Sequence, residues 1–145
     1  MTYSEKKFRI NIQKMLKDPN LYCKKIPDKK VTGLSANKGL PDYLIITKGK
    51  TYWFEIKQVV SKKYIPHTFN LDNISDNQWI EFTAMTNAGA EIFIAIYLNK
   101  ELYIIPFESV QYAKFIGGEK SIHQDILVKW RIKWSQELLK QKGIM

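Results

Sequence analysis

Three residues in the first half of the sequence have the types and the spacing that could cleave a phosphodiester. Asp42 follows Pro41, and Glu55 and Lys57 come thirteen and fifteen residues after Asp42. Burying two carboxylates side by side costs free energy unless a cation lies between them, and oxygen ligands select Mg²⁺ or Mn²⁺. The two acids could therefore hold a divalent cation beside a phosphate group, with the lysine as a further cation.

The residues around this trio indicate a β-hairpin that would bring the three side chains together. Residues 42–47 and 51–57 are rich in β-branched and aromatic side chains, and a lysine-glycine-lysine turn signal separates them. Because side chains alternate between the two faces of a strand, Glu55 and Lys57 point the same way. We expect Asp42, at the start of the first strand, to lie across from the end of the second.

Pro41, Asp42, Glu55 and Lys57 resemble the PD-(D/E)xK signature of a nuclease superfamily. Within it the sequence resembles the RecU-type Holliday junction resolvases over roughly residues 4 to 127. The segments that carry this resemblance are Asp42-Tyr43, Ile46, Lys48-Gly49, Phe54-Glu55 and Lys57, then Phe69, Leu71, Asn73-Ile74 and Gln78, and finally Lys120-Ser121-Ile122 with Asp125.

The resemblance implies an α/β fold of the restriction-endonuclease type, in which helices flank a mixed central β-sheet and residues 1–145 form a single nuclease domain. It implies a Mg²⁺-dependent DNA endonuclease, with Mn²⁺ as an alternative ion, that makes paired nicks in four-way junctions during recombination and repair. Asp42, Glu55 and the main-chain carbonyl of Ile56 would hold the metal. Lys57 would orient or deprotonate the attacking water, or neutralise developing charge. In the family, the glutamine at the position of Gln78 lies near the site, so Gln78 is expected to be a further catalytic-site residue that supports the trio or contacts the substrate.

Two further expectations follow from this implied activity. One site cuts one strand at a time, so symmetric incision of a junction predicts a homodimer. Glu5 is an additional catalytic candidate, because related nucleases carry an acidic residue on the first helix that aids metal binding. A favourable interaction with the helix dipole explains Glu5 equally well.

The sequence departs from the RecU-type pattern just before Asp42. Those enzymes carry a long insertion there, the stalk, whereas only residues 28–41 separate Ile26-Pro27 from Asp42 here. The stalk is associated with gripping the junction centre, so its absence leaves other substrates open, namely forks, flaps or plain duplex. A non-catalytic DNA-binding module is a third hypothesis. The intact trio argues against it, because a degenerate site usually loses one of the three residues.

The charge of the chain favours a polyanionic partner. The 145 residues carry a formal net charge of +9, and only two of the 23 basic residues, Arg9 and Arg131, are arginine. Lysine contacts phosphate as a point charge, whereas reading bases in the major groove usually requires arginine, so we expect recognition of DNA backbone and shape. Codon bias is the competing explanation of this lysine excess.

Basic and aromatic residues near the trio are the candidates for DNA contact. Residues 28–40 predict a loop beside Asp42. An irregular stretch is expected after Tyr64 and up to Asn73, and charges and rings are interleaved at Lys62, Lys63, Tyr64 and Phe69. Solvated or packed loops are the competing interpretation of both stretches. The expected DNA contacts are Ser35, Lys38, Lys62, Lys63, Tyr64 and Lys120.

Composition excludes several other classes. No apolar run reaches the roughly 18 residues of a membrane span, and the N-terminus lacks the apolar segment of a signal peptide. The single cysteine, Cys23, fits a reducing compartment and is expected to be a buried small apolar residue. We therefore expect a soluble cytoplasmic protein. His67 and His123 lack the spacing of a metal pair and are expected to have packing or surface roles.

The remaining pattern predicts the other elements of the fold. Trp130 and Trp134 are four residues apart, which favours core or dimer packing over base stacking. The expected elements are an amphipathic helix from Ser4 to before Pro19, a strand at 21–26, a helix capped by Ser75 or Asn73 that runs to about Asn87, a hairpin of inner strands at 91–98 and 101–107, a short weakly helical stretch at 107–115, and a last helix at 122–142 capped by Ser121 with Gln124.

Overall fold

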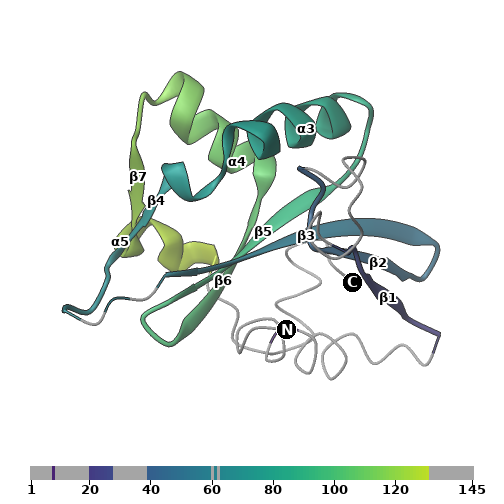
Figure 1. Cartoon of the computed structure of the whole chain (residues 1–145), viewed down its shortest axis with the longest axis horizontal. Coiled ribbons are helices and arrows are strands. Elements are labelled where there is room, and N and C mark those ends of the chain that lie inside the picture. Colours follow the sequence, from purple (N-terminus) through teal and green to yellow (C-terminus); the bar gives the residue numbers. More distant parts are fainter. Residues whose placement is uncertain (1–7, 9–19, 28–38, 60, 62, 131–145) are drawn as a thin grey trace.

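The structure is a computed structural model, and it describes residues 8, 20–27, 39–59, 61 and 63–130. These residues form one five-stranded mixed sheet and one small two-stranded sheet (Figure 1). The large sheet has the order β1-β2-β3-β5-β6, and the small sheet pairs β4 with β7. The strands are β1 (Tyr22–Lys25), β2 (Tyr43–Thr47), β3 (Lys50–Val59), β4 (Thr68–Asn70), β5 (Ile92–Leu98), β6 (Glu101–Pro106) and β7 (Ser121–His123).

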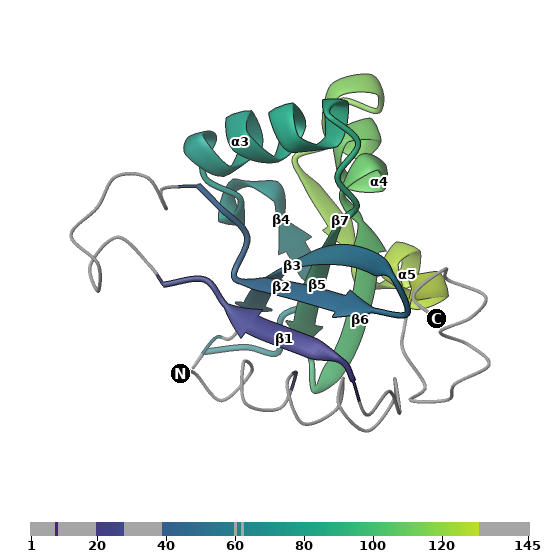
Figure 2. The same ribbon diagram turned by 90° about the vertical axis from the view of Figure 1, so that its right-hand side faces the viewer.

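Helices cover one face of the large sheet. Helices α3 and α4 lie together on the same side of it (Figures 1 and 2). The helical elements are the 3₁₀ turn η2 (Leu71–Asn73), α3 (Asp76–Asn87), α4 (Phe107–Gln111), the π-helical turn η3 (Tyr112–Ile116), α5 (Gln124–Leu127) and the 3₁₀ turn η4 (Val128–Trp130). The predicted mixed sheet with flanking helices is confirmed.

Both predicted hairpins form, because each has a two-residue turn of the favoured handedness. Lys48 and Gly49 have φ of 50° and 78°, and Asn99 and Lys100 have φ of 51° and 63°. Positive φ at both central residues gives a turn whose twist matches that of the flanking strands. The first turn joins β2 to β3 and the second joins β5 to β6, both antiparallel.

Strand β5 pairs in parallel with β3, and the chain between them passes through α3. Strand β5 lies between β3 and β6, so it is an inner strand, and it is buried along its whole length. Strand β6 is instead the last strand of the sheet, so the prediction of two inner strands is correct for β5 and wrong for β6. The side chains of β6 are nonetheless mostly buried.

The alternation of side chains along β3 divides the core into two layers. Phe54 and Ile56 lie in one layer, where the ring of Phe8 packs at 5.2 Å from that of Phe54. Trp53 and Val59 pack on the other layer, beneath α3, α4 and the small sheet. Glu55 and Lys57 share the face of Trp53, as predicted. Cys23 packs against the first layer, as expected, but it is half-buried rather than buried.

The prediction of a last helix capped by Ser121 is wrong. Residues Ser121–His123 are strand β7, which pairs antiparallel with β4 and sets Ile122 opposite Phe69. Burial of both side chains outweighs the local capping signal. Helix α5 begins only at Gln124, and the ring Nδ1 of His123 accepts the N–H of Asp125 as its cap. Strand β4 likewise replaces part of the irregular stretch predicted before Asn73.

Several sequence predictions lie outside the described residues. They are the amphipathic helix from Ser4 apart from Phe8, the loop at 28–38, and the chain after Trp130. Trp130 itself is half-buried and packs against the second core layer, which confirms its expected packing role, whereas Trp134 is not described. Among the described residues, no helix is long and apolar enough to cross a membrane.

Candidate active site

Asp42 is held in place by two main-chain groups from different strands. Its carboxylate Oδ2 accepts a 2.8 Å hydrogen bond from the N–H of Ile56 on β3. Its own carbonyl accepts a 2.7 Å bond from the N–H of Ile26, just beyond β1. The acid therefore sits at the start of β2 with its carboxylate directed at β3, which confirms the predicted approach of Asp42 to the second strand.

The turn before Asp42 lies against helix α3. Gly39 has φ of 86°, and a Cβ built on it would be 3.0 Å from the main-chain oxygen of Asn77 and 3.2 Å from Cβ of Glu81. Glycine permits both the positive φ and this close approach. The segment that carries Asp42 is thereby placed next to the first turns of α3.

Glu55 and Lys57 meet on the face of β3 that lies beneath α3. Lys57 Nζ is 3.3 Å from Glu55 Oε2. The glutamate side chain is 4% exposed and the lysine side chain 17% exposed, so the pair is largely removed from water. The predicted orientation of the two side chains to one side of the strand is confirmed.

Gln78 joins this pair from the first turn of α3. Its Nε2 donates to Glu55 Oε2 at 3.0 Å, and its Oε1 accepts from Lys57 Nζ at 3.0 Å. Helix α3 starts where predicted because Ser75 caps it, with the hydroxyl accepting from the N–H of Gln78 at 3.2 Å. The side chain of Gln78 therefore faces the trio, as the sequence indicated. What sequence reasoning missed is that the N–H of Ser75 also donates to Gln78 Oε1, at 3.0 Å.

Burial makes the charge of Glu55 costly. Removal from water, and next the nearby carboxylate of Asp42, raise the pKa of Glu55 from 4.5 to about 8, while Lys57 and Gln78 oppose that rise. Within the described part of the chain, Glu55 Oε1 is buried and has no hydrogen-bond partner. A buried anionic oxygen needs a compensating group. A divalent cation between Asp42 and Glu55 satisfies that need, so these residues fit a metal.

The protein ligands to such a cation are few. The described residues contain no cluster of three or more His, Cys, Asp or Glu side chains that could hold a metal. Two carboxylates with a main-chain carbonyl and waters are a usual set for Mg²⁺, which keeps several waters. Ile56 is the predicted source of that carbonyl. It is buried, and its N–H donates to Asp42 Oδ2.

The structure places only some of the expected DNA-contact residues. Lys63 and Tyr64 are exposed in the segment between β3 and β4, and the Tyr64 side chain is 69% exposed. Lys120 is exposed, and its carbonyl accepts the N–H of Leu71. The residues that lie outside the described part are Glu5, Ser35, Lys38 and Lys62. The two histidines contact protein groups: His67 contacts Gln124, and His123 caps α5.

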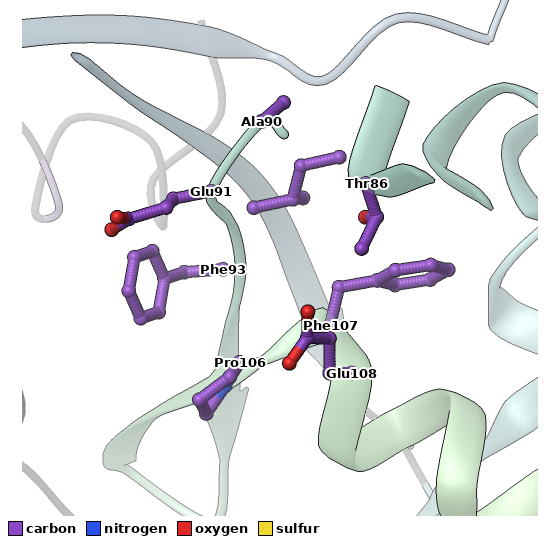
Figure 3. Close-up of a pocket in the computed structure, with 8 residues that line it drawn as sticks. Thr86, Ala90, Glu91, Phe93, Pro106, Phe107 and Glu108 are labelled. Carbon is purple, nitrogen blue, oxygen red and sulfur yellow. The ribbon is translucent and has the colours of Figure 1, made fainter. Parts of the chain in front are cut away.

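A cavity of about 330 Å³ lies apart from the trio, near the C-terminal end of α3 (Figure 3). Thr86 of α3 and Phe107 of α4 face it, and the carboxylates of Glu91 and Glu108 lie at its edge. Gln78 is in the first turn of the same helix and Thr86 in the last, so the cavity and the trio are at opposite ends of α3. Two acidic groups repel phosphate, and the cavity is not part of the candidate site.

Comparison with known proteins identifies the fold and the family. No curated protein matches the chain. The solved structure of Hjc from Archaeoglobus fulgidus, a Holliday junction resolvase from an archaeal hyperthermophile, is similar with a TM-score of 0.62 and 15% identity, over 95% of this chain and 98% of that one. That likeness shows a shared fold of the restriction-endonuclease type. The sequence matches the family of Recombination protein U over residues 2–140. The chain therefore belongs to the RecU family of Holliday junction resolvases.

Proposed function

We propose that this protein is a divalent-metal-dependent endonuclease that resolves Holliday junctions, with Mg²⁺ as the ion and Mn²⁺ as its substitute. The observation that carries the proposal is the half-buried Asp42 next to the buried Glu55, beside Lys57. Asp42 and Glu55 approach each other closely enough to raise the pKa of Glu55, and Glu55 Oε1 lacks a partner among the described residues. Membership of the RecU family supplies the substrate class.

The residues of the site have separable tasks in this mechanism. Asp42, Glu55 and the carbonyl of Ile56 hold the cation. When bound, the cation activates water and stabilises negative charge on the phosphate. Lys57 Nζ has three N–H donors. Among the described groups, two of them are directed at Glu55 and Gln78, which leaves the third for a phosphate oxygen. This arrangement favours charge neutralisation as the role of Lys57.

Exposed surface residues would bind the DNA backbone. We propose Lys63, Tyr64 and Lys120 for this role because they are exposed, basic or aromatic, and the chain carries a net charge of +9. Ser35, Lys38 and Lys62 are proposed from the sequence, together with Glu5 as a further metal-binding acid. Paired incision requires two sites related by a two-fold axis, so we propose a homodimer acting in the cytoplasm.

A substrate panel tests this function. Purified protein would be incubated with labelled four-way junction, fork, flap, duplex and single strand, each with Mg²⁺, Mn²⁺ or EDTA. We expect symmetric paired nicks in the junction, loss of cutting in EDTA, and a dimer by analytical ultracentrifugation at the same concentration. Cutting of fork and duplex as efficiently as the junction would favour a general nuclease over a resolvase. Binding of DNA without cutting in either metal would refute the proposal that the protein is an enzyme.

A further inference from the structure

The capping box of α3 reaches into the candidate active site. In a capping box, the N-cap side chain accepts the N3 main-chain N–H, and the N3 side chain accepts the N-cap N–H. Ser75 and Gln78 make both bonds, at 3.2 Å and 3.0 Å. The N3 side chain here also makes two further bonds, to Lys57 Nζ and to Glu55 Oε2, both at 3.0 Å.

Three groups around the side-chain amide leave Gln78 one favourable orientation. Two donors, the N–H of Ser75 and Nζ of Lys57, face Oε1, and one acceptor, Glu55 Oε2, faces Nε2. A flipped amide would place its NH₂ against both donors and its oxygen against the carboxylate. Glutamate would close a capping box equally well. It has no N–H to donate to Glu55, however, and it would add a third carboxylate beside Asp42.

We propose that Ser75 is a positioning residue for catalysis, whose main-chain N–H fixes the amide of Gln78 and through it Lys57 Nζ and Glu55 Oε2. With Oε2 occupied in this way, Oε1 of Glu55 is the oxygen that remains for a cation. The inference rests on the proposed metal-dependent function. It assigns the start of α3 a part in setting the geometry of the metal ligands.

Two substitutions at Ser75 separate this role from ordinary helix capping. Ser75→Ala and Ser75→Pro both remove the capping hydroxyl, and only Ser75→Pro also removes the main-chain donor. Ser75 has φ of −68°, and the preceding Ile74 is extended with φ of −92° and ψ of 115°. Both conformations are compatible with proline. The N–H of Ser75 bonds only to Gln78 Oε1 among the described groups, so the two variants differ in that one contact.

The primary measurement is Mn²⁺ affinity of the full-length protein by calorimetry, without DNA. Loss of a group that orients a metal ligand costs about 10-fold to 100-fold in affinity or activity. We expect Ser75→Pro to bind Mn²⁺ at least tenfold more weakly, by that same rule, than Ser75→Ala. Single-turnover junction cleavage should fall in parallel, while junction binding in EDTA should be equal in the two variants.

A Gln78→Ala background provides the matched control. If Ser75 acts through Gln78, then Ser75→Ala and Ser75→Pro will have the same Mn²⁺ affinity once Gln78 is truncated. Equal Mn²⁺ affinities of Ser75→Ala and Ser75→Pro when Gln78 is intact would overturn the proposal. A difference that persists without Gln78 would also overturn it, because the effect would then be structural.

Hydrogen exchange of the Ser75 amide tests the same contact without any Ser75 variant. Ser75 is exposed, so its N–H should exchange fast unless Gln78 holds it. We expect slow exchange in the unaltered protein and fast exchange in Gln78→Ala. Fast exchange in both proteins would refute the bond between the Ser75 N–H and Gln78 Oε1. Failure of the unaltered protein to cut junctions would refute the proposed function and leave this comparison and the Mn²⁺ titrations intact.

Discussion

Replacing Asp42 with asparagine should abolish junction cleavage while leaving the fold and DNA binding unchanged. The asparagine side-chain oxygen can still accept the N–H of Ile56, which now bonds to Asp42 Oδ2 at 2.8 Å, so the start of β2 should hold its position. What is lost is one of the two proposed anionic ligands for the cation. A metal ion contributes several kcal/mol to stabilising the transition state, so we expect a fall of roughly 10³-fold or more in the cleavage rate.

The measurement is single-turnover cleavage of a labelled four-way junction in saturating Mg²⁺, with junction affinity measured separately in EDTA. Asp72→Asn is a suitable control, because Asp72 is an exposed acid in η2. This variant should cleave the junction at the rate of the unaltered protein. Retention of more than a tenth of the rate by Asp42→Asn would contradict its role as a metal ligand.

Replacing Glu55 with glutamine should inactivate the enzyme and, in the absence of metal, stabilise it. The pKa of Glu55 is raised from 4.5 to about 8 in the folded protein, first by burial and second by Asp42. The folded state therefore binds the proton more tightly than the unfolded state. As the pH rises from 4.5 to about 8, the metal-free protein should lose stability, on the order of 3 to 5 kcal/mol in total.

Glutamine removes the ionisable group, so the stability of Glu55→Gln should not show this fall. Urea unfolding in EDTA at pH 5 and pH 8 would measure it, with the exposed Glu101→Gln as the control that should follow the unaltered protein. Adding Mg²⁺ at pH 8 should restore stability to the unaltered protein, because an ion that binds the folded state stabilises that state. It should not do so for Glu55→Gln, which lacks one of the two proposed carboxylate ligands. The same pH dependence of stability in both proteins would show that burial does not raise the pKa of Glu55.

The parts of the fold that follow from local sequence were predictable. The β2–β3 hairpin, its turn at Lys48-Gly49 and the alternation that places Glu55 with Lys57 depend on residues close together in the chain. Helix α3 was predictable for the same reason, since Ser75 and Gln78 form its cap and Gly89, with φ of 102°, follows its end. The carboxylates of the site could therefore be named from spacing.

Features that depend on distant pairing were not predictable in this way. Ser121 and Gln124 have the spacing of a capping box, but Ile122 is buried opposite Phe69, more than fifty residues away in the sequence. No local signal marks a three-residue strand whose partner is that remote. The position of β6 at the sheet edge is likewise a property of strand order rather than of the strand itself.

The site shows the same division between local and distant effects. Spacing and family resemblance named Gln78, but its two bonds to Lys57 and Glu55 depend on how α3 packs over β3. The raised pKa of Glu55 also requires the burial that the whole sheet provides. Neither the unpartnered Glu55 Oε1 nor the bond from the Ser75 N–H to Gln78 Oε1 has a sequence signal of its own.

The position of a bound metal ion tests the central claim most directly. Crystals of the protein soaked in Mn²⁺ would give an anomalous difference map that locates the ion without assumptions about activity. We expect a peak about 2.1 Å from carboxylate oxygens of both Asp42 and Glu55, with Glu55 Oε1 as the ligand oxygen, and no such peak in Asp42→Asn crystals. A map with no peak between these two acids, or with the ion bound elsewhere, would contradict the account.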